Sequence, residues 1–176
     1  NIYYEDVGEG EPILATHGLA EDGTYWSQTG VTQKLAESFR VVSMDMRGHG
    51  RTTVEGLPTG YDAGTMANDL GALADHLGLD RFHILSHATG GMAAVRYAMT
   101  ASPRLISLML TDTGSSTGPD FPGITWQELM PLFIQAAEDR KTASADEIIA
   151  RSRAEPGPFL FKMAEHPEAE KMWPIY

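Results

Sequence analysis

Short runs of apolar residues alternate, along the first 113 residues, with longer stretches in which apolar residues recur every three or four positions. Short apolar runs are typical of buried strands, and the three- and four-residue spacing is typical of amphipathic helices. The pattern predicts strands at 2–7, 12–16, 40–46, 81–86 and 105–111, and helices at 26–38, 61–77 and 88–101. Strands that alternate with helices indicate βαβ units, so we expect an α/β fold with a mainly parallel sheet and flanking helices.

The character of the chain changes after Thr113. Residues 114–123 are rich in glycine, serine and proline, which predicts a turn-rich hinge. Beyond the hinge the spacing predicts only helices, at 125–140, 144–153 and 157–165. Thr125 with Glu128, and Ser144 with Glu147, match the capping-box spacing at two of the predicted helix starts. We therefore expect a core over residues 1–113 and a separate helical segment over residues 114–176.

Composition narrows the class of protein. The chain has 176 residues, of which 42% are hydrophobic and 21% charged, as in an ordinary globular domain. The net charge of −11 argues against nucleic acid as a partner, because phosphates attract clusters of Lys and Arg. No apolar run approaches the roughly 18 residues that a membrane helix needs, so we expect no membrane association.

The residue types present and their spacing also argue against a cofactor. There is no cysteine, and no group of histidines and carboxylates has a metal-ligand spacing. Gly8-Glu-Gly10 lacks the third glycine and the helix of a dinucleotide-binding turn. We expect neither metal nor cofactor. The absence of cysteine and of a recognisable signal peptide favours a cytoplasmic location.

The segment with the most chemical information is Phe82-His-Ile-Leu-Ser-His-Ala-Thr-Gly-Gly-Met92, in which a buried strand turns directly into a helix. It resembles the nucleophile elbow of the α/β-hydrolases, usually Gly-x-Ser-x-Gly. Ser86 and Gly90 supply the small residues that such a strained turn needs. The nucleophile position falls on Ala88, whose methyl group cannot attack a carbonyl. A Ser→Ala substitution engineered to trap a ligand is the plainest explanation, and this form of the chain is expected to bind rather than turn over.

A second motif supports the resemblance. His17-Gly18-Leu19 follows the predicted strand at 12–16, where the family places one amide of its oxyanion hole. The resemblance implies that the two donors are the backbone N–H groups of Leu19 and Thr89, which a change of side chain at position 88 leaves in place.

A third motif, Asp45-Met-Arg-Gly-His-Gly-Arg-Thr52, matches the family's Asp-x-Arg-Gly-x-Gly loop after the following strand. Here a structural interpretation is favoured over a catalytic one. The glycines make the turn, and Arg47 and His49 are expected to brace neighbouring loops.

The base and the acid of the family's triad normally follow the nucleophile in the order Ser, Asp or Glu, His. The family's histidine comes after the last strand, so the resemblance implies that further strands, helices and the base lie beyond Tyr176. None of the histidines at positions 17, 49, 76, 83, 87 and 166 is a convincing base. Asp112, at the end of the strand after the elbow helix, is one candidate for the acid; a residue beyond Tyr176 is the other.

Residues 118–176 resemble the start of the family's helical cap, which roofs the active site. The cap aromatics and the loop after the second strand suggest a pocket for an apolar or aromatic small molecule. The candidate substrate-binding residues are His17, Gly18, Trp26, Phe121, Trp126, Met130, Phe133 and Trp173.

Several activities fit the same elbow. A carboxylic ester or lactone is the favoured substrate class, with hydrolysis of a carbon–carbon bond in a diketone second and a cofactor-free haloperoxidase or perhydrolase third. A natural hydrolase-like binding protein without a nucleophile is the non-enzymatic alternative. A sheet that ended after the strand at 105–111 would expose an edge, which either the remainder of the protein or a partner, such as a second copy of the chain, would cover.

Overall fold

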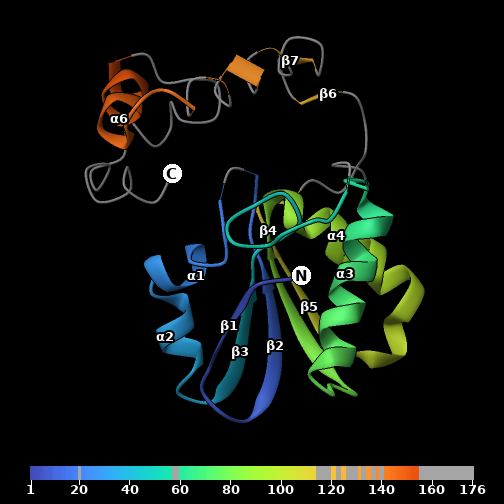
Figure 1. Ribbon diagram of the computed structural model, residues 1–176. Helices are drawn as coiled ribbons and strands as arrows, with labels where there is room; N and C mark the ends of the chain where they lie inside the picture. The colour runs from blue at the N-terminus through green and yellow to red at the C-terminus, as the bar shows by residue number, and fades with distance from the viewer. Residues whose placement is uncertain are drawn as a thin grey trace. The chain divides into compact units, whose positions relative to one another are not determined.

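The computed structural model describes residues 1–19, 21–56, 60–113, 120–121, 124–125, 131, 134–135, 138 and 141–154. The chain forms two compact units, Asn1–Ser115 and Ser116–Tyr176 (Figure 1). In the part of the chain that is described, none of the helices has the length and apolar surface to cross a bilayer.

The first unit is built on a five-stranded sheet with the order β1-β3-β2-β4-β5. The strands are β1 (Tyr4–Val7), β2 (Glu11–Thr16), β3 (Phe39–Met44), β4 (Phe82–His87) and β5 (Leu105–Thr111). β1 pairs antiparallel with β3, and the other three pairings are parallel. The expected mainly parallel sheet is confirmed, and β5 forms its edge within the described residues. All four parallel strands therefore bring their carboxyl ends to the same edge of the sheet.

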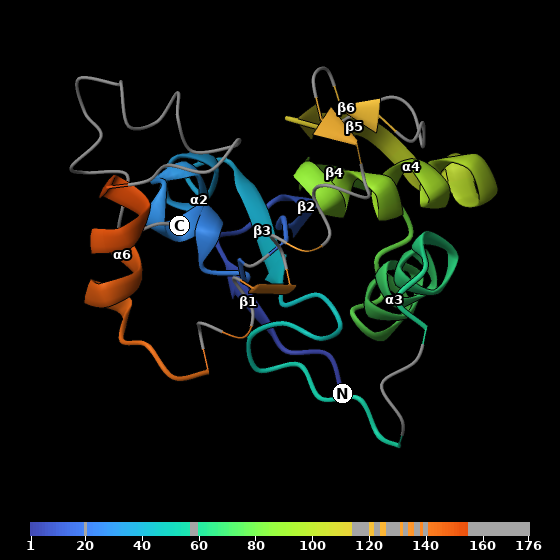
Figure 2. The same ribbon diagram turned by 90° about the horizontal axis from the view of Figure 1, so that it is seen from above.

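Helices cover both faces of this sheet (Figures 1 and 2). They are α1 (Tyr25–Gln28) and α2 (Val31–Leu35) on one face, with α3 (Ala63–His76) and α4 (Ala88–Ala101) on the other. Successive side chains of a strand point to opposite faces, which divides the core in two. Toward α3 and α4 the strands contribute Leu14, Val42, Met44, Phe82 and Ile84, and toward α1 and α2 they contribute Ile13, Ala15, Val41 and Leu85.

The predicted helix at 26–38 is wrong in one respect, because the structure has two short helices there. The backbone of Gly30 is left-handed, with φ of +79°, and it separates α1 from α2. Glycine adopts this conformation without the steric cost that a Cβ would impose. The helix predicted at 61–77 begins later, at Ala63, because the Asp62 side chain accepts the N–H of Thr65 as an N-cap.

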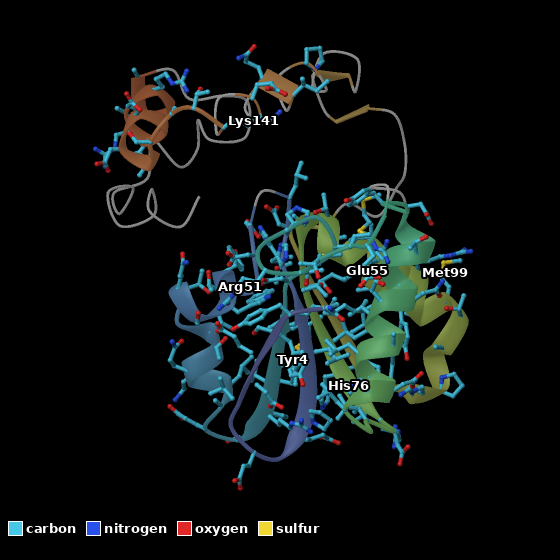
Figure 3. All side chains as sticks on the ribbon, viewed as in Figure 1. Tyr4, Arg51, Glu55, His76, Met99 and Lys141 are labelled. Carbon is cyan, nitrogen blue, oxygen red and sulfur yellow. The ribbon has the colours of Figure 1, made fainter. Side chains whose placement is uncertain are left out.

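Two side-chain ring contacts help to hold the edge strand β1. Tyr4 packs edge to face against His76 at the end of α3, with ring centroids 6.3 Å apart (Figure 3). The guanidinium group of Arg51 lies over the ring of Tyr3 at 3.5 Å from its centroid. These contacts anchor the antiparallel strand to both α3 and the loop that follows β3.

In the second unit, the helix predicted at 125–140 is confirmed at residues 131, 134–135 and 138, which are helical, and is wrong at its start. Residues Asp120–Phe121 (β6) and Ile124–Thr125 (β7) pair as antiparallel strands, so Thr125 does not begin a helix. The capping box at Ser144 is confirmed: the Ser144 N–H and hydroxyl donate to Glu147 Oε2 (2.7 and 2.9 Å), and Glu147 N–H donates to Ser144 Oγ (3.3 Å). It precedes α6 (Ala145–Ala154). The helix predicted at 157–165 lies outside the described residues.

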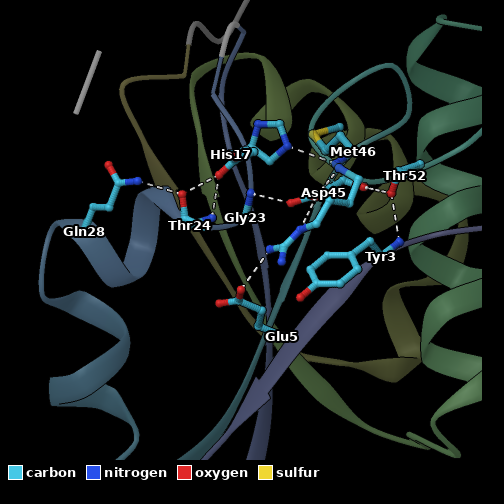
Figure 4. A network of polar contacts seen from close by, with 11 residues as sticks. Tyr3, Glu5, His17, Gly23, Thr24, Gln28, Asp45, Met46 and Thr52 are labelled. Carbon is cyan, nitrogen blue, oxygen red and sulfur yellow. Dashed lines mark hydrogen bonds and ion pairs between the residues drawn. The ribbon is translucent and has the colours of Figure 1, made fainter. Parts of the chain in front are cut away.

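Asp45 holds together the loops at the carboxyl edge of the sheet (Figure 4). Its side chain is 1% exposed, and its carboxylate accepts the backbone N–H groups of Gly23 (2.8 Å) and Arg51 (2.6 Å). The Thr52 hydroxyl donates to the Asp45 carbonyl at 2.7 Å and accepts the N–H of Tyr3 at 2.9 Å. One carboxylate thus fixes the chain after β2 against the chain after β3.

We predict that Asp45→Ala lowers the free energy of unfolding by about 3 kcal/mol, because one buried and one partly buried N–H group lose their acceptor. Urea denaturation followed by circular dichroism would measure the change. Asp80→Ala removes an exposed carboxylate and serves as the control, with an expected change within about 0.5 kcal/mol. Equal losses in the two variants would contradict the role given to Asp45.

Candidate functional site

The turn between β4 and α4 has the geometry expected of a nucleophile elbow. Ala88 follows β4 directly and is the first residue of α4, and its backbone is left-handed, with φ of +45°. A non-glycine residue with positive φ costs about 1–2 kcal/mol, so it persists only where the surrounding structure imposes it. Within the described residues, Asp112 alone shares this property.

Small residues around Ala88 allow this sharp turn. A Cβ at Gly90 would collide with the carbonyl oxygen of His17, and one at Gly91 would collide with the Thr113 side chain. The buried hydroxyl of Ser86 accepts a hydrogen bond from Thr16 Oγ1 at 2.8 Å. The requirement for a small residue at position 90, inferred from the sequence, therefore has a steric cause, and Ser86 on the other side is held by a buried hydrogen bond.

The loop after β2 lies against the elbow. A Cβ placed on Gly18 would lie 3.1 Å from both the Ala88 methyl and Cδ2 of His87. Leu19, the next residue, is 47% exposed. Thr89 is half-buried in the first turn of α4, where backbone N–H groups have no acceptor within the helix. The structure thus brings Gly18 beside Ala88, while the roles of the Leu19 and Thr89 amides remain predictions.

His17 is fully buried and both of its ring nitrogens are engaged, one of them with Met46, as Figure 4 shows. The N–H of Met46 donates to Nε2 at 2.9 Å, so Nδ1 carries the ring hydrogen and donates it to the Gly18 carbonyl at 2.8 Å. Burial lowers the pKa of His17 below 6.5, with the neighbouring His49 acting in the same direction. These contacts make His17 a neutral brace of the loop, and its role in substrate binding stays a prediction.

The loop after β3 has contacts that agree with the structural interpretation. Arg47 makes a bidentate ion pair with Asp69 of α3, at 2.7 and 2.8 Å. The hydrogen bonds and ion pair with Asp69 raise the pKa of Arg47. His49 packs edge to face on His17, with centroids 5.0 Å apart.

Asp112 lies at the end of β5, close to the elbow in space. Its neighbour Thr113 donates a hydrogen bond from its hydroxyl to the Ala88 carbonyl at 3.2 Å. Asp112 itself is exposed and its backbone is left-handed, with φ of +55°. Its location is therefore compatible with the predicted acid.

The predicted pocket residues have different outcomes. Trp26 is 4% exposed and packs in the core with Leu85, and its indole N–H donates to the Thr16 carbonyl at 3.3 Å. Phe121 lies in β6, of which only the backbone is described. Trp126, Met130, Phe133 and Trp173 lie outside the described residues. No group of histidines and carboxylates that would hold a metal occurs among the residues that the structure describes.

One side chain at this site, Glu21, was missed in the sequence, and it contacts His87, which was considered from the sequence only as a base. Glu21, whose side chain is 6% exposed, accepts the N–H of Gly18 at 2.7 Å and lies 3.4 Å from Nε2 of His87. The His87 ring stacks on Tyr25, with centroids 4.7 Å apart, and its Nδ1 lies 3.3 Å from Thr111 Oγ1. The three-residue separation of Gly18 and Glu21 is a signal for such a contact, but apolar periodicity gives no reason to single it out.

Comparisons with known proteins agree with this geometry. Residues 11–143 match the family model for the alpha/beta hydrolase fold. The chain is 40% identical over 120 residues to a proline iminopeptidase of Clostridioides difficile, an overlap that covers 65% of this chain and 40% of that protein. The chain therefore spans less than half the length of this curated relative.

Two solved structures are similar over nearly the whole chain. A thermophilic esterase from Thermogutta terrifontis has 29% identity and a TM-score of 0.64, covering 99% of this chain and 60% of that one. Est816, described as an N-acyl homoserine lactone degrading enzyme, has 27% identity and a TM-score of 0.63, covering 94% of this chain and 61% of that one.

We predict that Ala88→Gly leaves the free energy of unfolding unchanged or raises it by about 0.5 kcal/mol, since relief of the left-handed strain outweighs the added freedom of the unfolded chain. The matched control is Ala98→Gly in the interior of α4, which should cost about 1 kcal/mol. Denaturant titration of both variants would measure this difference. If Ala88→Gly costs as much as its control, position 88 is not strained.

We also predict that the ring of His17 is still neutral at pH 6.5, with its hydrogen on Nδ1. The folded pKa lies below the unfolded value, so the unfolded chain takes up the proton first and stability falls as the pH drops below about 6.5. Nitrogen-15 NMR of the ring would show one protonated and one bare nitrogen. A ring protonated on both nitrogens at that pH would contradict the assignment.

Proposed function

The chain belongs to the α/β-hydrolase fold family, and from this premise we propose that its active form hydrolyses a carboxylic ester or lactone through a serine at position 88. The observation that carries the proposal is the left-handed backbone of Ala88 between β4 and α4. That conformation presents one side chain at the carboxyl edge of the sheet, beside Gly18. A hydroxyl at this position would serve as a nucleophile.

In the proposed reaction, the serine Oγ attacks the substrate carbonyl while its proton passes to a base, which later returns it to the leaving alcohol, and a tetrahedral oxyanion forms. The N–H groups of Leu19 and Thr89 stabilise that oxyanion, and the partial positive charge at the start of α4 adds to the effect. Collapse of the intermediate expels the alcohol, and water then releases the acid by the same route. With Ala88 the attack cannot occur, but the amides remain, so this form of the chain binds ligand without turnover.

The proposed base is a histidine C-terminal to residue 176, as the resemblance to the family implies; the chain covers 40% of the proline iminopeptidase and 60% of the esterase. The acid is either a residue in that same part or Asp112. The position of Thr113, which donates a hydrogen bond to the Ala88 carbonyl, supports Asp112 because it places the end of β5 at the elbow.

The choice of ester or lactone follows from the esterase and the lactone-degrading enzyme among the similar structures. One curated relative is a proline iminopeptidase. The panel of test substrates therefore also includes an amide. Residues 114–176 are proposed as a lid that supplies an apolar or aromatic wall, with Phe121, Trp126, Met130, Phe133 and Trp173 as its candidate pocket residues.

Ala88 also supports a second candidate, a hydrolase-like protein that binds a small molecule and has no activity of its own. The two candidates differ in what they require of position 88. If Ala88 replaces a catalytic serine, as we propose, the remaining machinery is intact and a hydroxyl restores activity. If the chain is a natural receptor, a hydroxyl adds nothing.

We predict that Ala88→Ser in the whole protein raises kcat/KM by on the order of 10⁵-fold on at least one of p-nitrophenyl acetate, an aryl lactone and a prolyl p-nitroanilide. Release of the chromophore or acid measures the rate. Ala88→Gly fits the left-handed backbone but carries no hydroxyl, and it is the matched control, expected to stay inactive. A folded Ala88→Ser variant that binds these compounds without cleaving any of them would contradict the proposal and support the receptor.

A further inference from the structure

We propose that Glu21 is a positioning residue, which fixes the loop after β2 against the elbow and so sets the distance between the Leu19 and Thr89 amides. The inference rests on the proposed function in that these amides are taken as the oxyanion donors. Glu21 belongs to neither the elbow nor the His-Gly motif. Its proposed role adds one residue to the description of the oxyanion site.

The carboxylate of Glu21 contacts both sides of the site. Oε2 accepts the N–H of Gly18 at 2.7 Å, and Oε1 lies 3.4 Å from Nε2 of His87, the residue before the nucleophile position. A Cβ built on Gly18 would lie 3.0 Å from Oε2 of Glu21 and 3.1 Å from the Ala88 methyl. The Glu21 carboxylate and the Ala88 methyl thus face each other beside Gly18, with space between them for about one methyl group.

This arrangement controls the direction of the Leu19 amide. Peptide groups are planar, so two anchors fix two successive planes of the loop. Glu21 holds the N–H of Gly18, while the Nδ1–H of His17 holds the carbonyl of Gly18, which shares its plane with the N–H of Leu19. In a trans peptide the N–H of Leu19 points opposite to the carbonyl of Gly18. The direction of this N–H is therefore fixed only as firmly as the two anchors hold the loop.

The burial of Glu21 explains why the carboxylate stays in place. A carboxylate whose side chain is 6% exposed has to be hydrogen-bonded or paired to be tolerated. Gly18 and His87 provide these partners, and the stacking of His87 on Tyr25 of α1 restricts the imidazole in turn. Gly18 lies in the same loop as Glu21, so movement of the loop away from the elbow would separate the carboxylate from His87, and this buried contact favours one loop position.

The first experiment is hydrogen–deuterium exchange on the whole protein with alanine at position 88. Glu21→Ala and Glu21→Asp, which keeps the charge but is one methylene shorter, should raise exchange at the Gly18 and Leu19 amides by at least about tenfold, a free-energy change of about 1.4 kcal/mol. Glu21→Gln keeps an oxygen for the N–H of Gly18, and its amide N–H donates to Nε2 of His87 once the imidazole carries its hydrogen on Nδ1, so this variant should exchange like the parent. Glu9→Ala, at an exposed turn before β2, is the control.

The second experiment repeats the Glu21 variants in the Ala88→Ser background. Glu21→Ala should lower kcat by roughly 100-fold, as for a misplacement of about 1 Å, with little change in KM, and Glu21→Gln should restore kcat to within a few fold. Unchanged exchange at Gly18, or a Gln variant as slow as the Ala variant, would overturn the inference. An inactive Ala88→Ser parent would count against the proposed function, while the exchange data would still decide whether Glu21 fixes the loop.

Discussion

Between β4 and α4 the chain changes from strand to helix within one residue, and the left-handed backbone that this requires at Ala88 is costly for any side chain. The turn exists because its neighbours leave room for it. Gly90 passes against the His17 carbonyl, Gly91 against Thr113, and Gly18 against Ala88 itself. Two of these contacts join the elbow to the end of β2, and the third joins it to the end of β5. The strained residue is therefore also the point at which the loops after β2 and β5 meet.

The surrounding loops are fixed by buried polar groups rather than by apolar packing. Asp45 holds two loops through backbone N–H groups, and His17 joins the Met46 amide to the Gly18 carbonyl. Buried groups of this kind are costly when unpaired, so each of them favours one arrangement of the backbone. The proposed role of Glu21 follows the same principle. With Glu21 in this role, the oxyanion amides are positioned before the substrate binds, by contacts that do not involve the substrate.

The sequence predicts the sheet and its main helices because buried strands and amphipathic helices leave different apolar periods. It also predicts the elbow, whose small residues are a steric requirement. It fails at Gly30, where one glycine divides a helix whose apolar spacing continues across the break, and at Thr125, where short-range pairing with Asp120 prevails over a capping pattern. Side-chain roles are less predictable. The aromatic ring of Trp26 suits a pocket wall as well as a core, and only the folded chain shows that it packs with Leu85.

The central claim is that position 88 presents a nucleophile to a carbonyl held by the Leu19 and Thr89 amides. The most direct measurement is a crystal structure of the whole protein with Ala88→Ser after reaction with diethyl p-nitrophenyl phosphate, which phosphorylates activated serines. The account predicts a phosphorus atom bonded to the new Oγ at position 88, with its phosphoryl oxygen within hydrogen-bonding distance of both amides. An unmodified hydroxyl in a folded protein, or a phosphoryl oxygen directed away from Leu19 and Thr89, would contradict it.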